Sequence, residues 1–380
     1  MSAIQSVVGF LIVIGVLVFF HELGHFSFAK LFKMKVEEFA IGFGKRLVRV
    51  GYDGETEYTL RALPLGGFVR IKGMEIEDAV EQRITGSGSG VDDDSSELRP
   101  AATDPNDPDG FNNRPIYQRA LVIAAGPAFS LVLGWLSLCL IGVIYGFPTR
   151  STVRVDEVNK GSIAQQVGLK PGDVLIAIDG KPVNDFVNAL DTIQGSAGTA
   201  LRLTFRSGSA VSGATREITA TPKSEVVAGL DKPIGRLGFK PSPVVLESQR
   251  VALGESFRRG NEQVAFWFQM MGKLVSSGAI KDNLGGPVAI FQETKNAAQI
   301  GGSRYLELLG QLSLSLGLFN LLPVPVLDGG HLALMALEAI RRRKLTAEQT
   351  NRVFMAGFAL LVLLLIVVTF KDVTRLFIRG

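Results

Sequence analysis

The chain has few residues that could form a covalent cross-link or a cysteine-based metal site. Its 380 residues include one cysteine, Cys139, which lies inside an apolar run. A single cysteine excludes an intramolecular disulfide and a cysteine-rich metal centre. Histidine is almost as scarce, because only His21, His25 and His331 occur. A metal site in this chain must therefore combine these imidazoles with carboxylates.

Long stretches of the sequence also lack charge. Hydrophobic residues make up 47% of the chain and charged residues 20%, and the apolar residues gather into long runs, which favours a membrane protein over a soluble enzyme. The net charge of +4 could indicate an acidic partner. The basic residues, however, cluster beside the apolar runs, where they orient a membrane protein. We therefore expect a lipid environment and no nucleic-acid partner.

Four apolar runs predict four transmembrane helices. We place the first at 1–30, the second at 114–148, the third at 304–340, and the fourth after a basic turn within 341–380. The first run has no basic leader or small-residue cleavage site, so we interpret it as a retained helix. Basic residues follow the first run, precede the second and separate the last two, which indicates cytoplasmic loops. Both chain ends are then predicted outside a bacterial inner membrane.

The loops between these runs differ in composition. Residues 31–75 alternate apolar and polar side chains, which predicts short strands in a small β region at the cytoplasmic membrane surface. Residues 76–113 are rich in glycine, serine and acidic side chains, which predicts a mobile cytoplasmic loop. Residues 244–303 have a helical pattern, but their apolar stretch is too short to cross a membrane. We therefore expect a helical linker on the outer surface.

The outer loop at 151–243 is long enough for a domain of its own. A short helix ends near Gly168, a Pro-Gly turn follows, and an apolar strand closes at Asp179-Gly180, a strong hairpin signal. Further strands are predicted at 201–206 and 216–222. The pattern resembles a bacterial PDZ domain. Such a domain can add an extended peptide to a sheet edge, although a spacer or a lid is also consistent with the sequence. The predicted fold class is a polytopic α-helical membrane protein with a membrane-associated β region and an extracytoplasmic α+β PDZ domain.

The first apolar run contains His21-Glu22-Leu23-Gly24-His25. This spacing places two imidazoles one helical turn apart on one face, where both can bind one zinc ion, with Glu22 beside the open coordination position. In a soluble helix two such histidines are more often surface residues. Within hydrocarbon each ionisable residue costs roughly 2.5–3.5 kcal/mol, so a compensating metal ion is the better interpretation.

A catalytic zinc ion requires a third protein ligand and keeps one position for water. The candidate segment is Asn320-Leu321-Leu322-Pro323-Val324-Pro325-Val326-Leu327-Asp328-Gly329-Gly330-His331. Its two prolines interrupt the helix, and broken backbone at membrane depth is tolerated where it lines a cavity. We predict Asp328 as the ligand. His331 is chemically possible, but a packing role is equally consistent with its position.

Together these two motifs resemble the site-2 protease family of intramembrane zinc metalloproteases, over nearly the whole chain. The order of parts, with Pro64-Leu65-Gly66-Gly67-Phe68-Val69-Arg70 and Ala125-Gly126-Pro127, is most similar to the bacterial regulators of sigma-E protease. The resemblance implies Zn²⁺ bound by His21, His25 and Asp328, Glu22 as the catalytic base, and substrate binding by Asn320, Gly66 and Gly67. The two glycines belong to the β region, which would pair with an unwound substrate segment.

Two departures from the family pattern stand out. Only one PDZ domain is evident where relatives often have two, and Ser130 occupies a position after Gly126-Pro127 where asparagine is common. We expect neither departure to touch the metal site.

The predicted activity is hydrolysis of peptide bonds within the transmembrane segments of single-span proteins. By resemblance, substrates would include an anti-sigma factor after a first outer cut, and remnant signal peptides. The PDZ domain would contact substrate tails or gate access. One alternative is a non-proteolytic PDZ adaptor with a structural zinc ion, although a structural site has no need for Glu22. Another is a zinc transporter, which predicts ligands spread over several spans, and the second and fourth runs lack them.

Overall fold

The computed structural model describes residues 3–74, 109–207, 214–225, 233–278, 285–343 and 346–379. The chain divides into two compact units, one of Met1–Ile141 with Ser256–Gly380 and one of Gly142–Glu255. Most of the predicted cytoplasmic loop at 76–113 lies outside the described residues. Its end forms a short 3₁₀ turn, η1 (Phe111–Asn113), whose Phe111 is buried.

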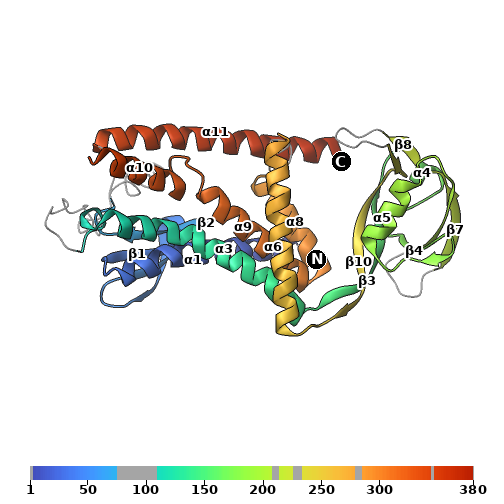
Figure 1. Cartoon of the computed structure of the whole chain (residues 1–380), viewed down its shortest axis with the longest axis horizontal. Helices are drawn as coiled ribbons and strands as arrows, with labels where there is room; N and C mark the ends of the chain where they lie inside the picture. The colour runs from blue at the N-terminus through green and yellow to red at the C-terminus, as the bar shows by residue number, and fades with distance from the viewer. Residues whose placement is uncertain are drawn as a thin grey trace. The chain divides into compact units, whose positions relative to one another are not determined.

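The first unit is mainly helical and carries one small sheet (Figure 1). Its elements in chain order are α1 (Ala3–Leu31), β1 (Val36–Tyr52), β2 (Glu57–Ile71), α3 (Ile116–Ile144), α6 (Leu253–Ser276), α8 (Pro287–Ile300), α9 (Gly302–Asn320), α10 (Asp328–Arg341) and α11 (Ala347–Arg379).

Within the described residues, three helices are long and apolar enough to cross a membrane. They are Val7–Leu31 in α1, Ile116–Ile144 in α3 and Glu348–Thr374 in α11. The expected third span corresponds to α9, a break at 321–327 and α10. Helix α9 is not among these three, and its 19 residues include the polar Arg304, Glu307 and Gln311.

Strands β1 and β2 pair as an antiparallel sheet that packs on α1. They are longer than the short strands expected, at 17 and 15 residues. The first part of β1 lies between two parts of β2, because Phe39 is opposite both Val69 and Tyr58. Gly42 and Gly44 have positive φ of 93° and 81°, which glycine adopts without a steric penalty and which lets β1 change direction between its two parts.

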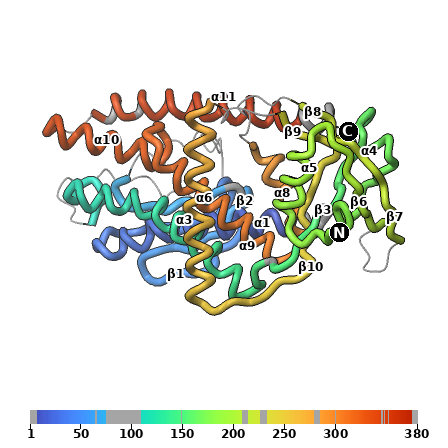
Figure 2. The backbone as a smooth tube through the Cα atoms, turned by 45° about the vertical axis from the view of Figure 1, so that its right-hand side comes forward, coloured from blue at the N-terminus to red at the C-terminus, as the bar shows by residue number. Residues whose placement is uncertain are grey.

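Small residues allow the helices of this unit to approach closely. A Cβ on Gly24 of α1 would lie 2.3 Å from the Ala125 carbonyl oxygen of α3, and one on Gly134 of α3 would lie 2.9 Å from the Gly310 carbonyl oxygen of α9. Helix α6 crosses α3 in both views (Figures 1 and 2). A Cβ on its Gly260 would lie 2.5 Å from the Cys139 sulfur, so Cys139 is a packing residue at this crossing.

The second unit is built around a β-sheet. Its strands are β3 (Phe147–Val158), β4 (Val174–Ile178), β5 (Lys181–Pro182), β6 (Leu201–Arg206), β7 (Thr215–Ala220), β8 (Lys223–Glu225), β9 (Ile234–Arg236) and β10 (Phe239–Gln249), with helices α4 (Ile163–Gln166) and α5 (Phe186–Gly195). The sheet order is β10-β3-β4-β6-β7, β5 pairs with β4, and β8 pairs with β9. The strands extend past both ends of the predicted range 151–243, since β3 begins at Phe147 and β10 ends at Gln249.

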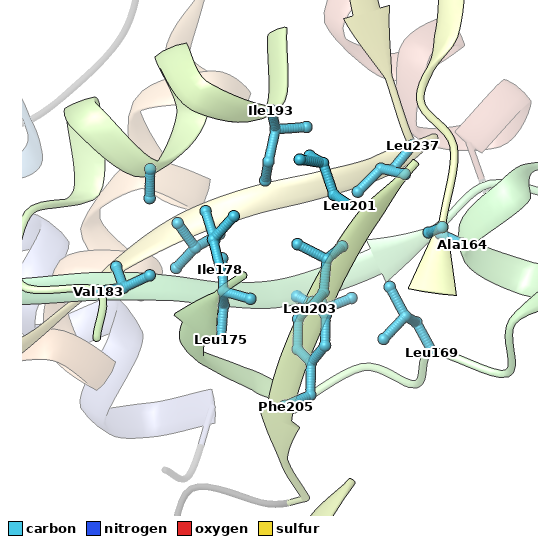
Figure 3. Close-up of a cluster of buried hydrophobic side chains, with 14 residues drawn as sticks. Ala164, Leu169, Leu175, Ile178, Val183, Ile193, Leu201, Leu203, Phe205 and Leu237 are labelled. Carbon is cyan, nitrogen blue, oxygen red and sulfur yellow. The ribbon is translucent and has the colours of Figure 1, made fainter. Parts of the chain in front are cut away.

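The core of the second unit is apolar and closes around Leu203 and Phe205, which are completely buried (Figure 3). Alternating residues of β6 point into it, as the buried–exposed pattern of that strand shows. The predicted hairpin at Asp179-Gly180 is confirmed. Both residues have positive φ, 48° and 77°, and β4 pairs with β5 on either side of them.

Candidate active site

Helix α1 presents the predicted histidine pair toward one buried point. His21 and His25 are 8% exposed and Glu22 is 9% exposed. The two Nε2 atoms lie 3.4 Å apart, with the rings 5.0 Å between centroids. The apolar run forms one continuous helix from Ala3 to Leu31, so the four-residue spacing places both imidazoles on one face.

Asp328 completes this cluster from the other end of the chain. Its Oδ2 lies 3.2 Å from His21 Nε2, and its Oδ1 lies 3.6 Å from His25 Nε2. One ligand atom from each of these three residues can be chosen so that all lie within 4.8 Å of one another. Asp328 opens α10, and the positive end of the helix dipole favours a carboxylate there.

The segment between α9 and α10 holds Asp328 in place through close backbone contacts. A Cβ on Gly329 would lie 2.2 Å from the Leu322 carbonyl oxygen, and one on Gly330 would lie 2.3 Å from that of Val324. Within this turn Val326 has φ of +82°, a costly conformation for a β-branched residue. The two glycines after Asp328 are therefore needed for the tight turn that aims its carboxylate at the histidines.

Helix α3 supports both histidines from behind. His25 Nδ1 lies 2.9 Å from the Val122 carbonyl oxygen, and His21 Nδ1 lies 3.0 Å from Ser130 Oγ. Between these two contacts, a Cβ on Gly126 would lie 2.1 Å from His25 Nε2, so only glycine lets α3 come this close. The expectation that Ser130 does not touch the metal site is wrong, because its hydroxyl contacts one of the two histidines.

The remaining predicted site residues line the same cavity, whose volume is about 290 Å³. Asn320, at the end of α9, places Nδ2 3.1 Å from His21 Nε2. Gly67 packs directly on α1, because a Cβ there would lie 3.2 Å from Glu22 Cγ. Gly66 has φ of +127°, and a Cβ there would meet the Phe43 ring. The cavity is lined by Val18, His21, Glu22, His25, Phe43, Gly66, Gly67, Phe68, Val69, Ile71, Met74, Ile123, Leu316, Asn320, Val326, Leu327 and Asp328.

A buried ion cluster stiffens the sheet beside this cavity. Glu38 is 5% exposed, and both of its carboxylate oxygens accept hydrogen bonds at 2.9 Å from Arg61 Nη2. Arg70 Nη1 lies 3.2 Å from the same carboxylate. Both guanidinium groups also lie over the Phe68 ring, at 4.7 and 5.4 Å from its centroid. The cluster thereby fixes the strand that carries Gly66 and Gly67.

His331 lies one helical turn beyond Asp328 but is not in the three-residue group. Its ring packs on Phe354 of α11, with the ring centroids 4.4 Å apart. The packing role left open by the sequence is the one that this contact supports.

The donor set fits a zinc ion. Asp328 Oδ2 is buried and accepts no hydrogen bond among the described residues, an unsatisfied position that a cation would fill. Two imidazole nitrogens and one carboxylate are also the ligands of a catalytic zinc site, with one position open toward the cavity. Nothing in the cluster is soft enough to favour copper(I) or an iron–sulfur centre.

Ser130, the Val122 carbonyl and Gly126 were not predicted as site residues. Two of them could have been noticed in the sequence. Ser130 is a polar residue within an apolar run, and Gly126 is the centre of the Ala125-Gly126-Pro127 motif in the same run. The Val122 carbonyl gave no signal, because any residue at that position supplies the same backbone oxygen.

Comparisons with known proteins give the family of the chain. The model of peptidase family M50 matches residues 9–364. The zinc metalloprotease RasP of Geobacillus kaustophilus is 30% identical over 433 aligned residues, covering 99% of this chain and 100% of that protein. The regulator of sigma-W protease RasP of Bacillus subtilis is 30% identical over 430 aligned residues, covering 99% and 100%.

Among solved structures, the PDZ domain of the SdrC-like protein Lmo2051 from Listeria monocytogenes covers 23% of this chain and 85% of that chain, at 20% identity and a TM-score of 0.20. That likeness is too weak to decide the fold of the second unit. The family model and the full-length relatives are decisive: the chain belongs to peptidase family M50, the site-2 proteases, and is a zinc metalloprotease.

Proposed function

We propose that this protein cleaves peptide bonds inside membrane-spanning segments, with His21, His25 and Asp328 as the zinc ligands and Glu22 as the catalytic base. One observation carries the proposal. The three ligand atoms converge within 4.8 Å, and the histidines lie on a helix apolar enough to cross a membrane. A hydrolytic centre on such a helix is suited to substrates that are themselves embedded in lipid.

Glu22 is suited to the role of general base. It is buried, it lines the cavity, and it lies between the two histidines on α1. When bound, Zn²⁺ supplies the Lewis acid that polarises the scissile carbonyl and makes water acidic enough to react near pH 7. The Glu22 carboxylate accepts the water proton and returns it to the leaving amine.

Asn320 is placed to bind the substrate near the reacting carbonyl. Its amide nitrogen lies 3.1 Å from His21 Nε2, and the residue lines the cavity, so with zinc on Nε2 an amide N–H would be within reach of a carbonyl oxygen beside the metal. An amide donor in that position holds the substrate backbone and helps stabilise negative charge on the oxygen.

The strand at Gly66 and Gly67 is the proposed docking edge for the substrate. A transmembrane helix keeps its backbone hydrogen bonds internal, so the segment to be cut must first unwind. An extended segment can then recover backbone hydrogen bonds by pairing with a strand. Without side chains, Gly66 packs against the Phe43 ring and Gly67 packs against α1, so this edge lines the same cavity as Glu22.

The proposed topology has four crossings, with α9 as a short third span of about 28 Å. Lys30 in the last turn of α1 and Lys33 just after it support an orientation with the histidines toward the cytoplasmic side. Both termini and the second unit are then outside a bacterial inner membrane. In intact cells, an impermeant thiol reagent should label Ser224→Cys in the second unit and not Arg342→Cys in the basic turn. The reverse pattern would contradict this orientation.

The substrates we propose are single-span membrane proteins already trimmed on the outside, such as an anti-sigma factor, and remnant signal peptides. The Bacillus subtilis relative is named as a regulator of sigma-W, which supports a regulatory substrate of this kind. The second unit, which we interpret as a PDZ domain, has β10 at the edge of its sheet. That edge can bind a substrate tail, or the unit can restrict access.

The test is cleavage of a trimmed single-span substrate by the full chain purified in detergent, with Glu22→Gln compared with the native protein. Glu262→Gln on an exposed face of α6 is the matched control. We expect Glu22→Gln to retain zinc and to lose roughly 10²–10⁴-fold in rate, while Glu262→Gln cuts normally. If Glu22→Gln retains zinc and cuts as fast as the native protein, Glu22 is not the base; if the native protein holds zinc and cuts no trimmed membrane segment, the proposed substrate class is wrong.

A further inference from the structure

Ser130 places a hydroxyl group in a buried, apolar environment. It is completely buried, within a helix apolar enough to cross a membrane. Burying a hydroxyl without a hydrogen bond costs about 1–3 kcal/mol by protein mutational data. The side-chain oxygen lies 3.0 Å from His21 Nδ1, so this contact offsets the cost.

A third helix holds the backbone of Ser130 at the same place. Ser313 of α9 donates its hydroxyl to the Ser130 carbonyl oxygen at 2.9 Å. Ser313 is also completely buried. The Ser130 side chain therefore faces α1 while its backbone is tied to α9, which limits how far the hydroxyl can move away from His21.

The contacts of the two histidines indicate which ring nitrogen carries the proton. The Val122 carbonyl can only accept, so His25 must donate from Nδ1 and keeps the Nε2 lone pair for a metal ion. His21 Nε2 faces Asn320 Nδ2 at 3.1 Å and Asp328 Oδ2 at 3.2 Å. When His21 binds zinc through Nε2, the metal takes that lone pair, so the ring proton is on Nδ1 and Ser130 Oγ accepts it.

The two acceptors occupy one face of α3. Val122 and Ser130 are eight residues apart, and Gly126 lies midway between them, so all three follow the four-residue row of a helix. Gly126 admits the His25 ring, and the residues on either side hold the two imidazoles. The acceptors differ in kind, because a mutation can remove the Ser130 hydroxyl but cannot remove the Val122 carbonyl.

We propose that Ser130 is a positioning residue that accepts a hydrogen bond from His21 Nδ1 and thereby fixes the imidazole with Nε2 directed at zinc. The proposal rests on the zinc site proposed above. Partners of this kind orient metal-binding histidines and raise their basicity, and their loss typically lowers metal affinity 10–100-fold. Ser130 thus sets zinc affinity, and it affects the reaction only through His21.

The test measures the zinc dissociation constant by chelator competition on the full chain in detergent. Ser130→Ala is compared with Ser137→Ala, which removes another buried hydroxyl of α3 about 10 Å further along the helix. The thermal midpoint of each metal-free protein is recorded as a measure of packing. We expect Ser130→Ala to weaken zinc binding 10–100-fold, Ser137→Ala to change it less than twofold, and the two metal-free midpoints to agree.

Two results would overturn the positioning role. One is unchanged zinc affinity in Ser130→Ala, and the other is an equal loss in both serine variants, which would indicate a general packing effect. The His21→Ala variant distinguishes failure of the Ser130 proposal from failure of the proposed zinc site. If the native protein binds zinc and His21→Ala does not, the proposed site stands and only the role of Ser130 is in question. If His21→Ala binds zinc like the native protein, both proposals fall.

Discussion

The interiors of the two units differ in chemistry and in how far apart their residues lie in sequence. The core of the second unit is an apolar cluster drawn from residues 153–237, and its buried carboxylate, Asp173, is paired with Arg216. The first unit buries His21, Glu22 and His25 around a cavity and completes the cluster with a carboxylate near the opposite end of the chain. An apolar core stabilises a fold by area buried, whereas buried ionisable groups cost free energy and are kept for chemistry.

Gly126→Ala is expected to have the largest effect on zinc content and cleavage, and this effect is confined to the histidine cluster of the first unit. Its Cβ would lie 2.1 Å from His25 Nε2, so α3 or the imidazole must move. We expect zinc content to fall sharply and cleavage to drop by at least roughly 100-fold, the upper end of what loss of outer-shell support costs. Gly15→Ala in α1, which meets no atom within 4 Å, is the control for both assays. Full zinc content in Gly126→Ala would contradict the close approach of α1 and α3.

Phe205→Ala tests the apolar interior in the same way. Phe205 is completely buried in the core of the second unit, so removing its ring should destabilise that unit by about 3–5 kcal/mol. We expect the unfolding transition of the second unit to move to lower temperature in calorimetry, with zinc content unchanged. Loss of zinc in this variant would mean that the two interiors are not independent.

Asp372→Ala should have a smaller effect, confined to the helical unit. Asp372 of α11 is 5% exposed, and its Oδ2 accepts hydrogen bonds from the backbone N–H groups of Gly286 at 2.8 Å and Ala289 at 3.2 Å. These are donors that a helix start leaves unsatisfied. Their loss should cost about 1–3 kcal/mol and accelerate amide hydrogen exchange at the start of α8. Asp372→Asn keeps an acceptor and should exchange more slowly than the alanine variant; equal rates would count against the cap.

The smallest expected effect is a pH dependence of the turn between β1 and β2. Hydrogen bonds from the backbone N–H groups of Thr56 and Glu55 lower the pKa of Asp53 to about 2. Since this folded-state pKa lies below the unfolded value of about 3.9, the charged form stabilises the turn above pH 4, and that contribution disappears as pH falls toward 2. Carbon-detected NMR titration of Asp53 should show this midpoint. A midpoint near 4 would mean that the turn hydrogen bonds do not persist in solution.

The two interiors also differ in how well the sequence predicted them. In the second unit local turn residues and alternation predicted the Asp179-Gly180 hairpin and strands at 201–206 and 216–222, which correspond to β6 and to β7 at Thr215–Ala220. In the first unit the strands proved longer than predicted, because Gly42 and Gly44 redirect β1 without ending it. The prediction that Ser130 lies away from the metal site was also wrong. Its position in an apolar run does not reveal which neighbouring helix it faces.

The local sequence was enough to predict the histidine pair, because two residues four apart share one face of any α-helix. It also indicated Asp328, because two prolines interrupt the helix just before this carboxylate. The partners that hold these groups come from the packing of distant helices. The contact between His21 and Ser130 joins residues 109 positions apart, and that between His25 and the Val122 carbonyl joins residues 97 positions apart. Such contacts depend on the register between packed helices, which leaves no periodic pattern in either helix alone.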